Sequence, residues 1–130
     1  MEDIVFIAGP YFGDGSYEVI ESNIEEAERY AIALANYGIF FFCPHLHTRH
    51  FEVKSEAEEA FFKALDLLIL SKCSALVALP RWRESSGARH EVDIFIKDHK
   101  PVFFMSSLKD IDQVVEWFKS RETKLPPSSF

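Results

Sequence analysis

The sequence lacks an excess of basic residues, and this shortage limits its partners. Lys and Arg number 14 against 21 Asp and Glu, which gives a formal net charge of −7. A broad nucleic-acid surface needs a basic footprint to neutralise phosphates, so we expect no nucleic-acid partner. This negative net charge still allows a small phosphate site made by backbone amides at the start of a helix.

Long apolar runs and cysteines are also scarce. No run reaches the length of a transmembrane helix, so we expect no membrane partner. Glu2 and Asp3 occupy the place where a signal peptide carries its basic residues. The two cysteines, Cys43 and Cys73, lie at the edges of apolar runs, where a free thiol behaves as a small hydrophobe. These features predict a reduced, cytoplasmic protein.

Phenylalanine, by contrast, is abundant, with 13 among 130 residues. Such a count favours an aromatic core or rings placed in a pocket or subunit interface. The length fits one compact domain, which we assign to residues 1–120, followed by a tail at 121–130. The short chain and its many rings predict a homo-oligomer, a dimer or higher.

Short apolar runs alternate with amphipathic segments along the chain. The runs predict buried strands at residues 4–8, 39–43, 75–80 and 101–105. Capping signals predict helices that begin at Ser22, Ser55, Ser85 and Ser107, and segment 44–54 has the composition of a polar loop. This alternation predicts an α/β fold: a small, doubly wound parallel sheet of the flavodoxin-like type, in three α/β/α layers. The expected strand order is 2-1-3-4, with room for a fifth strand.

The expected topology also predicts where a ligand binds. In such sheets ligands bind beyond the carboxyl ends of the strands, at the point where the strand order reverses. Here that point lies between the first and third strands, where the loops GPYFGDGS (9–16) and PRWRESSG (80–87) converge.

One carboxylate lies where an apolar residue is expected. In a helix that begins near Ser85, Glu91 shares its face with Ala88 and Phe95. The helix N-terminus favours the ionised carboxylate and the apolar flank favours the neutral acid, and such opposed effects are typical of a catalytic carboxylate. The alternative is a structural salt bridge with Arg29 or Arg89.

A second carboxylate, Asp66, has apolar residues at three of its four helical neighbours. Its alternative role is that of a surface residue paired with Lys63. Two carboxylates on neighbouring apolar faces could divide nucleophilic attack and proton transfer between them, as in glycoside cleavage.

The two convergent loops supply the substrate-binding candidates. Ser85, Ser86 and Gly87 offer hydroxyls and free amides to an anion or a sugar hydroxyl, although simple N-capping would also place serine there. The first loop could fold round a sugar or phosphate, but it matches neither the dinucleotide fingerprint nor the P-loop. From that loop the candidates are Gly9, Tyr11, Phe12 and Gly13.

Histidines and aromatic residues add further candidates. The spacing C-x-H-x-H-x-x-H at 43–50 fits no zinc pattern, so we expect no metal, and His45 or His47 is better explained as lining the site or as part of a polar loop. Trp82 could stack on a nucleobase, or it could instead pack in its loop or form a subunit contact.

Three arginines near the second loop allow two readings. They could attract a phosphate or neutralise nearby carboxylates. These residues are Arg81, Arg83 and Arg89.

Together these motifs resemble the nucleoside 2-deoxyribosyltransferase-like superfamily. The elements that carry the resemblance are FIAGPY at 6–11, FCPHLHTRHFE at 42–52, the helix of Asp66, and WRESSGARHE at 82–91. The similarity runs from about Ile4 to Phe104 and is strongest with small members that carry a W-x-x-S-x-G-A-x-x-E motif.

The resemblance implies roles for matching residues. A Glu at the position of Glu91 is the nucleophile that attacks the anomeric carbon of a nucleoside or nucleotide, and an Asp at the position of Asp66 assists. Serine at the position of Ser85 contacts a 5′-phosphate in the hydrolase branch. No cofactor is implied. Two positions depart from the pattern: Phe6 stands where a tyrosine helps position the nucleophile, and Ser74 where an acidic residue is common.

The sequence therefore predicts cleavage or transfer of an N-glycosidic bond. Phe6 cannot donate a hydrogen bond, although Tyr11 could supply a hydroxyl from the loop. One alternative is an inactive nucleotide-binding or sensing module, and another is a structural role in an assembly.

Overall fold

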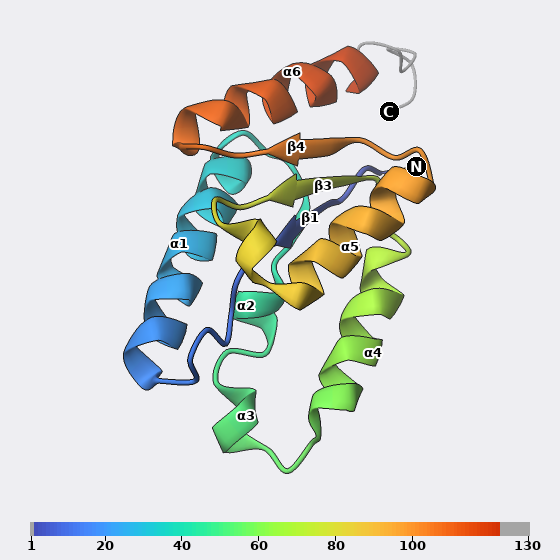
Figure 1. Ribbon diagram of the computed structural model, residues 1–130. Helices are drawn as coiled ribbons and strands as arrows, with labels where there is room; N and C mark the ends of the chain where they lie inside the picture. The colour runs from blue at the N-terminus through green and yellow to red at the C-terminus, as the bar shows by residue number, and fades with distance from the viewer. Residues whose placement is uncertain (1, 123–130) are drawn as a thin grey trace.

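Four parallel strands form the centre of the molecule, as the computed structural model shows for residues 2–122. The strands are β1 (Val5–Ala8), β2 (Phe41–Phe42), β3 (Ala75–Ala78) and β4 (Val102–Phe104), in the order β2-β1-β3-β4. Helices cover the sheet on both sides (Figure 1). The flavodoxin-like, three-layer arrangement predicted from the sequence is confirmed, and the described residues contain no fifth strand.

Six helices and two 3₁₀ turns lie between and after the strands within residues 2–122. The helices are α1 (Tyr17–Asn36), α2 (Pro44–His47), α3 (Phe51–Lys54), α4 (Glu59–Leu70), α5 (Ser86–Lys97) and α6 (Ile111–Glu122). The turns are η1 (Trp82–Glu84) and η2 (Leu108–Asp110). In Figure 1, α4 lies at the edge of the molecule, below α5.

Alternating side chains of the two central strands feed two separate cores. Val5 and Ile7 of β1 join the apolar faces of α1 and α6, whereas Phe6 and Ala8 join α5 and the end of α4. This alternation follows from the two-residue period of a strand. Because β1 and β3 have helices on both faces, all their residues are apolar and buried.

Two helices begin at other residues than the capping signals predict: α1 begins earlier and α4 begins later. α1 begins at Tyr17, because the Ser16 side chain accepts a hydrogen bond from the Val19 amide at 3.3 Å, so the predicted start at Ser22 is wrong. α4 begins at Glu59 rather than after Ser55, whose hydroxyl donates to the Phe51 carbonyl at 2.8 Å. Ser16 and Ser55 each form a hydrogen bond with nearby backbone. A glutamate three residues after a serine is therefore not enough to fix where a helix begins.

Segment 44–54 forms α2 and α3 rather than the predicted polar loop. Its polar side chains face α1 and the loop after β1, which the local composition does not reveal. The starts at Ser85 and Ser107 agree with the structure: Ser85 caps α5, and Ser107 caps η2, which leads into α6. The expected tail at 121–130 lies outside the described residues from 123 onward, and residues 121 and 122 continue α6.

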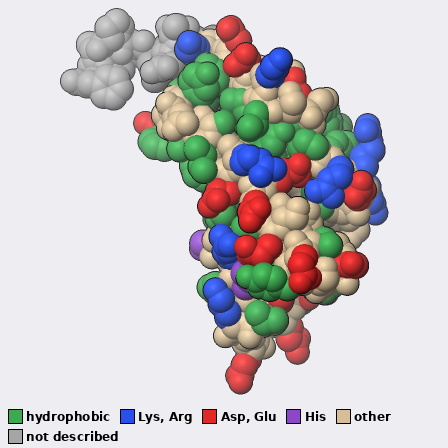
Figure 2. All heavy atoms as spheres, turned by 90° about the vertical axis from the view of Figure 1, so that its left-hand side faces the viewer, with side chains coloured by type: hydrophobic (Ala, Val, Ile, Leu, Met, Phe, Trp, Pro, Cys, Tyr) green, Lys and Arg blue, Asp and Glu red, His purple; other side chains and the backbone are tan. Residues whose placement is uncertain are grey.

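The outer surface of α1 is strongly polar. Glu18, Glu25 and Arg29 are exposed on it, and most apolar residues of the helix face the sheet, although Ile32 is exposed. Figure 2 views the molecule from this side and shows carboxylates mixed with scattered basic side chains. This is the usual pattern for a helix that is covered on one side only.

Candidate active site

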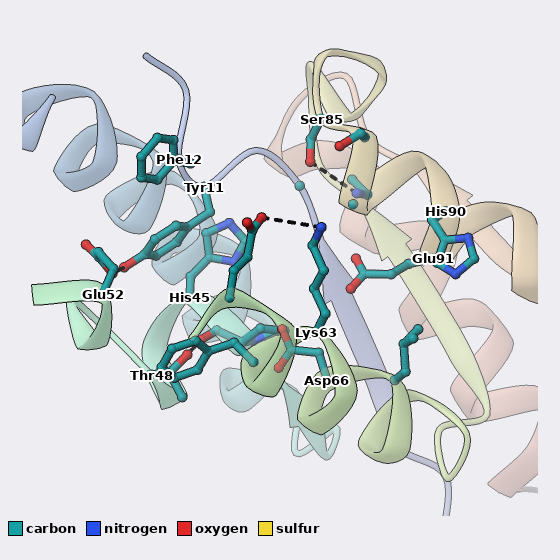
Figure 3. Close-up of a pocket in the computed structure, with 18 of the residues that line it drawn as sticks. Tyr11, Phe12, His45, Thr48, Glu52, Lys63, Asp66, Ser85, His90 and Glu91 are labelled. Atoms are coloured by element: carbon teal, nitrogen blue, oxygen red, sulfur yellow. Dashed lines mark hydrogen bonds and ion pairs between the residues drawn. The ribbon is translucent and has the colours of Figure 1, made fainter. Parts of the chain in front are cut away.

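A cavity of about 710 Å³ opens at the carboxyl ends of β1 and β3 (Figure 3). Its walls are the loop after β1, segment α2–α3, one face of α4 and the first two turns of α5. This is the position that the predicted strand order gives for a ligand site.

Glu91 reaches this cavity from the second turn of α5 (Figure 3). Ala88, Val92 and Phe95 of the same helix are buried against the sheet, which turns the half-buried Glu91 toward α4. Burial raises the pKa of Glu91 to about 8, and the negative charge of Asp66 contributes to the rise. At neutral pH the Glu91 carboxyl is therefore mainly protonated.

Asp66 reaches the same cavity from α4, on the opposite side (Figure 3). Burial raises the pKa of Asp66 to about 6, against an opposing effect of the His47 charge. The two carboxyls thus hold different charges near neutrality, with Asp66 mainly ionised and Glu91 mainly neutral. This difference gives a site one proton donor and one carboxylate.

Neither carboxyl forms an ion pair within residues 2–122. Lys63, the alternative partner of Asp66, binds Glu59 at 3.3 Å instead. Arg89 donates to the carbonyl of Arg83. The structural salt bridges considered for the two carboxylates are therefore not formed in the described part of the chain.

The start of α5 forms one wall of the cavity. Ser85 has an extended backbone, and its Oγ accepts a hydrogen bond from the Ala88 amide at 3.1 Å. N-capping thus accounts for Ser85, and its hydroxyl proton can still be donated to a ligand. Ser86 and Gly87 also line the cavity, with the amides of the first helical turn. A β-carbon at Gly87 would meet only Ser85 Oγ, at 3.8 Å.

The loop after β1 forms the facing wall. Gly9, Tyr11 and Phe12 line the cavity, whereas Gly13 does not. Gly13 has φ +55 and packs against Val19, so its need for glycine is conformational. Gly9 also has a packing role, because a β-carbon there would lie 2.6 Å from Leu79 Cδ1.

His45 is buried and lines the cavity. The sequence had suggested this position for either His45 or His47. Its Nε2 donates to the Pro10 carbonyl at 2.8 Å. Burial lowers the pKa of His45, so the ring is neutral and Nδ1 carries a lone pair. Nδ1 has no hydrogen-bond partner among the described residues. His47 points elsewhere and packs edge-on against Phe42.

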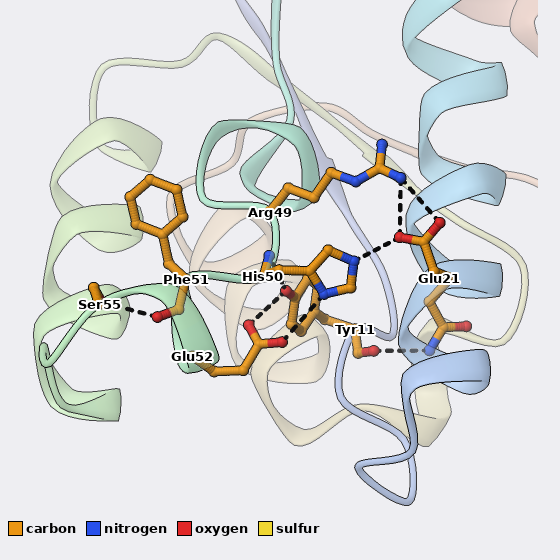
Figure 4. A network of polar contacts seen from close by, with 8 residues as sticks. Tyr11, Glu21, Arg49, His50, Phe51, Glu52 and Ser55 are labelled. Atoms are coloured by element: carbon orange, nitrogen blue, oxygen red, sulfur yellow. Dashed lines mark hydrogen bonds and ion pairs between the residues drawn. The ribbon is translucent and has the colours of Figure 1, made fainter.

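A polar network fixes the cavity rim (Figure 4). The Tyr11 hydroxyl donates to Glu52 Oε1 at 2.7 Å and accepts from the His50 amide at 2.9 Å. The His50 ring bonds Glu21 Oε1 at 2.6 Å, and Arg49 forms two bonds with the same carboxylate. The network ties α1, the first loop and α3 together, and it occupies the Tyr11 hydroxyl away from Glu91.

Trp82 and the arginines lie outside the cavity lining. Trp82 packs against Phe104 with ring centroids 5.3 Å apart, and Arg83 lies over its ring. Arg81 donates to Asn23 at 3.0 Å and pairs with Glu26. Of the predicted roles for Trp82, loop packing fits this position.

The structure places both positions at which the sequence departs from the deoxyribosyltransferase-like pattern. Phe6 is fully buried and packs against Phe42 at 5.9 Å. Ser74 lies before β3, at the opposite edge of the sheet from the cavity, where its Oγ accepts from the Ile4 amide at 3.4 Å. Ser74 therefore does not reach the site.

Sequence reasoning missed several residues of the cavity. Lys63 shares the Asp66 face, and its position could have been found from the helical spacing. Thr48 and Glu52 were missed because α2 and α3 were taken for a loop. The additional lining residues include Thr48, Phe51, Glu52, Glu59, Phe62, Lys63, Leu67 and His90.

Within residues 2–122 no three His, Cys, Asp or Glu side chains lie together in a way that could hold a metal ion. In the same range no helix has the length and hydrophobicity needed to cross a membrane. Cys43 and Cys73 are both free and buried.

Fold and site together define a flavodoxin-like α/β domain with a pair of carboxyls in a cavity at the carboxyl edge of its sheet. Residues 3–107 match the model of a family described as a domain of unknown function (DUF1937), and the chain belongs to this family. No curated protein matches the sequence.

Proposed function

We propose that this protein cleaves or transfers the N-glycosidic bond of a nucleoside or nucleoside 5′-monophosphate, through a glycosyl intermediate on Glu91. The observation that carries the proposal is the position of Glu91 and Asp66 in one cavity at the carboxyl ends of β1 and β3, where neither carboxyl forms an ion pair with any described residue. The resemblance of WRESSGARHE and the Asp66 helix to the deoxyribosyltransferase-like superfamily supports the same chemistry.

The first step forms one bond and breaks another. A carboxylate oxygen of Glu91 bonds to the anomeric carbon while the bond from that carbon to the base nitrogen breaks. The bonding electron pair leaves with the base, which takes a proton from the Asp66 carboxyl. This step needs Glu91 ionised and Asp66 protonated, which is the reverse of the distribution that the two pKa values give near neutrality. The reactive form is therefore the less populated of the two states in which the pair holds a single proton.

The second step returns the carboxyls to their starting state. Water, or the nitrogen of a second base, attacks the anomeric carbon, and the bond to Glu91 breaks. Asp66 takes the proton that the attacking group loses. Two displacements at one carbon retain its configuration.

The remaining cavity residues would bind the substrate. The hydroxyl of Ser85 and the amides of Ser86 and Gly87 would contact the sugar or its phosphate. Lys63 is the one Lys or Arg among the described lining residues, and its ammonium would move from Glu59 to a phosphate. Nδ1 of His45 would accept a hydrogen bond from a donor on the substrate, which would satisfy a buried acceptor.

The test is base release from a panel of nucleosides and nucleoside 5′-monophosphates, followed by chromatography. We expect release by the wild type, loss of at least about a hundredfold in Asp66→Asn and complete loss in Glu91→Gln. Asp93→Asn is the matched control, because Asp93 is exposed on α5 and pairs with Lys97. Intact-protein mass spectrometry after rapid quenching should show a sugar adduct that Glu91→Gln lacks.

A nucleotide-binding or sensing module is the second candidate. Phe6 favours it, because the first strand then supplies no hydroxyl near the nucleophile, and the Tyr11 hydroxyl is held by Glu52 and His50. Saturable binding of a nucleotide without base release, measured by calorimetry, would support this function and exclude glycosyl transfer. Absence of both would exclude both functions.

A further inference from the structure

The two faces of α4 have opposite characters. Glu59, Lys63 and Asp66 lie on the face that lines the cavity. On the opposite face Phe61, Ala64 and Leu68 follow one another at helical spacing and are exposed. Phe61 exposes 57% of its surface and Leu68 64%. This outer stripe of Phe61, Ala64 and Leu68 is apolar where a surface helix is normally polar.

The rest of α4 makes this exposure more unusual. Leu70 is the one buried residue of the helix, although most of its sequence EAFFKALDLLIL is apolar. An apolar face of a helix is normally covered by another part of the protein or by a partner. α1 of the same protein shows the contrast, because its outer surface carries Glu18, Glu25 and Arg29. The outer stripe therefore has the composition of an interface.

We propose that a second copy of this chain docks antiparallel on the outer stripe, with its own α4 across a two-fold axis. The stripe is self-complementary about the point between Ala64 and Leu65. An antiparallel pair centred there places Phe61 against the partner subunit's Leu68, and Leu68 against the partner subunit's Phe61. A two-fold interface needs this kind of self-matching surface.

Charges at the two ends of the stripe favour the antiparallel arrangement. Glu56 and Glu58 are exposed before α4, and Lys72 is exposed after it. In the antiparallel pair each Lys72 lies opposite the partner subunit's Glu56 and Glu58, at both ends of the interface. A parallel pair would place like charges together. This complementarity identifies a second copy as the occupant, in a chain whose net charge of −7 opposes random self-association.

Docking would cover the back of the helix that holds Asp66. The dimer would thus support one cavity wall in each subunit without entering the cavity. The inference is independent of the proposed function, since it uses the opposite face of α4 and a different measurement.

The first test is sedimentation of the purified full chain over a range of concentrations. We expect a dimer whose dissociation constant rises at least about tenfold in Leu68→Lys, because the two-fold axis would bury two unpaired ammonium groups. Ile32→Lys on α1 is the matched control, because Ile32 is 52% exposed and α1 packs on the opposite face of the sheet from α4. A monomeric wild type, or equal weakening by both variants, would overturn the proposal. Far-UV circular dichroism confirms that the variants fold.

The second test locates the axis. Ala64→Cys should give a disulfide-linked dimer under mild oxidation, whereas Ile32→Cys on the opposite face of the sheet should not. The buried Cys43 and Cys73 should contribute little background. Lys72→Glu should weaken the dimer, and adding Glu56→Lys and Glu58→Lys should restore it. Failure of both the cross-link and the charge exchange would place any dimer on another surface.

Discussion

Asp66 on α4 and Glu91 on α5 face one cavity, and the negative charge of Asp66 contributes to the raised pKa of Glu91. Removing that charge should therefore lower the pKa of Glu91 in Asp66→Asn. The pKa should stay above its ordinary value of 4.5, because burial is the larger cause. Carbon-13 NMR of the Glu91 carboxyl measures the change, with Asp93→Asn as a control that leaves it unaltered.

Stability should depend on pH through the same carboxyl. The folded protein holds the Glu91 proton up to about pH 8, whereas the unfolded chain releases it near 4.5. Wild type should therefore lose stability relative to Glu91→Gln as pH rises from about 5 to 8. The expected loss is on the order of a few kcal/mol, because a pKa difference of one between the folded and unfolded states corresponds to at most about 1.4 kcal/mol. Urea denaturation at pH 5 and pH 9 tests this, and a constant difference would contradict it.

The proposed reaction should have a bell-shaped pH profile. The pair holds one proton between the pKa of Asp66, about 6, and that of Glu91, about 8. Since the reactive form holds a single proton, kcat/KM should be largest at about pH 7 and fall on both sides. Rates of base release across this range test the assignment, and a rate that rises steadily to pH 10 would argue against Asp66 as the acid.

Two glycines of the cavity should respond differently to alanine. Gly9→Ala should destabilise the fold by about 1–3 kcal/mol, because its new β-carbon would lie 2.6 Å from Leu79 Cδ1. Gly87→Ala meets no such neighbour and should keep or slightly raise stability, while an added methyl at the cavity wall should raise KM. Thermal unfolding and steady-state kinetics separate the two effects. An unchanged KM would mean that the substrate does not approach Gly87.

The network at the cavity rim should depend on one hydroxyl. Tyr11→Phe removes the donor to Glu52 and the acceptor of the His50 amide, which should cost about 1–2 kcal/mol. Tyr17→Phe is the control, because the Tyr17 ring stacks on His50 at 5.0 Å without using its hydroxyl in a described hydrogen bond. Equal stability of the two variants would show that the hydroxyl contributes nothing.

The fold was predictable because strong signals repeat along the chain. IVFIA and ALVALP are apolar without interruption, and the helices between them are amphipathic, so a buried parallel sheet and its order follow. The start of α5 was predictable because the two possible caps, Ser85 and Ser86, are adjacent, so that the choice between them shifts the start by one residue only. The start of α1 was not, because Ser16 and Ser22 both carry capping signals and only Asp14, which accepts from the Ser16 amide at 2.9 Å, distinguishes them.

The positions of cavity residues were predictable where these residues lie at the carboxyl ends of strands or on a defined face of a helix. Asp66 and Glu91 share the cavity with Ser85 and Gly9 because the topology brings these elements together. Trp82 and Gly13, which were among the predicted substrate-binding residues, do not line this cavity, since sequence proximity to a loop does not fix the direction of a side chain. The contribution of Thr48 and Glu52 depends on tertiary contacts of α2 and α3, which local sequence does not encode.

The anchoring of α4 has a mechanical consequence. The helix is held at its last residue, Leu70, while its first turn at Glu59 is exposed. Asp66 lies one turn before the anchored end. A displacement of the first turn would therefore change the entrance to the cavity more than it would change the position of Asp66.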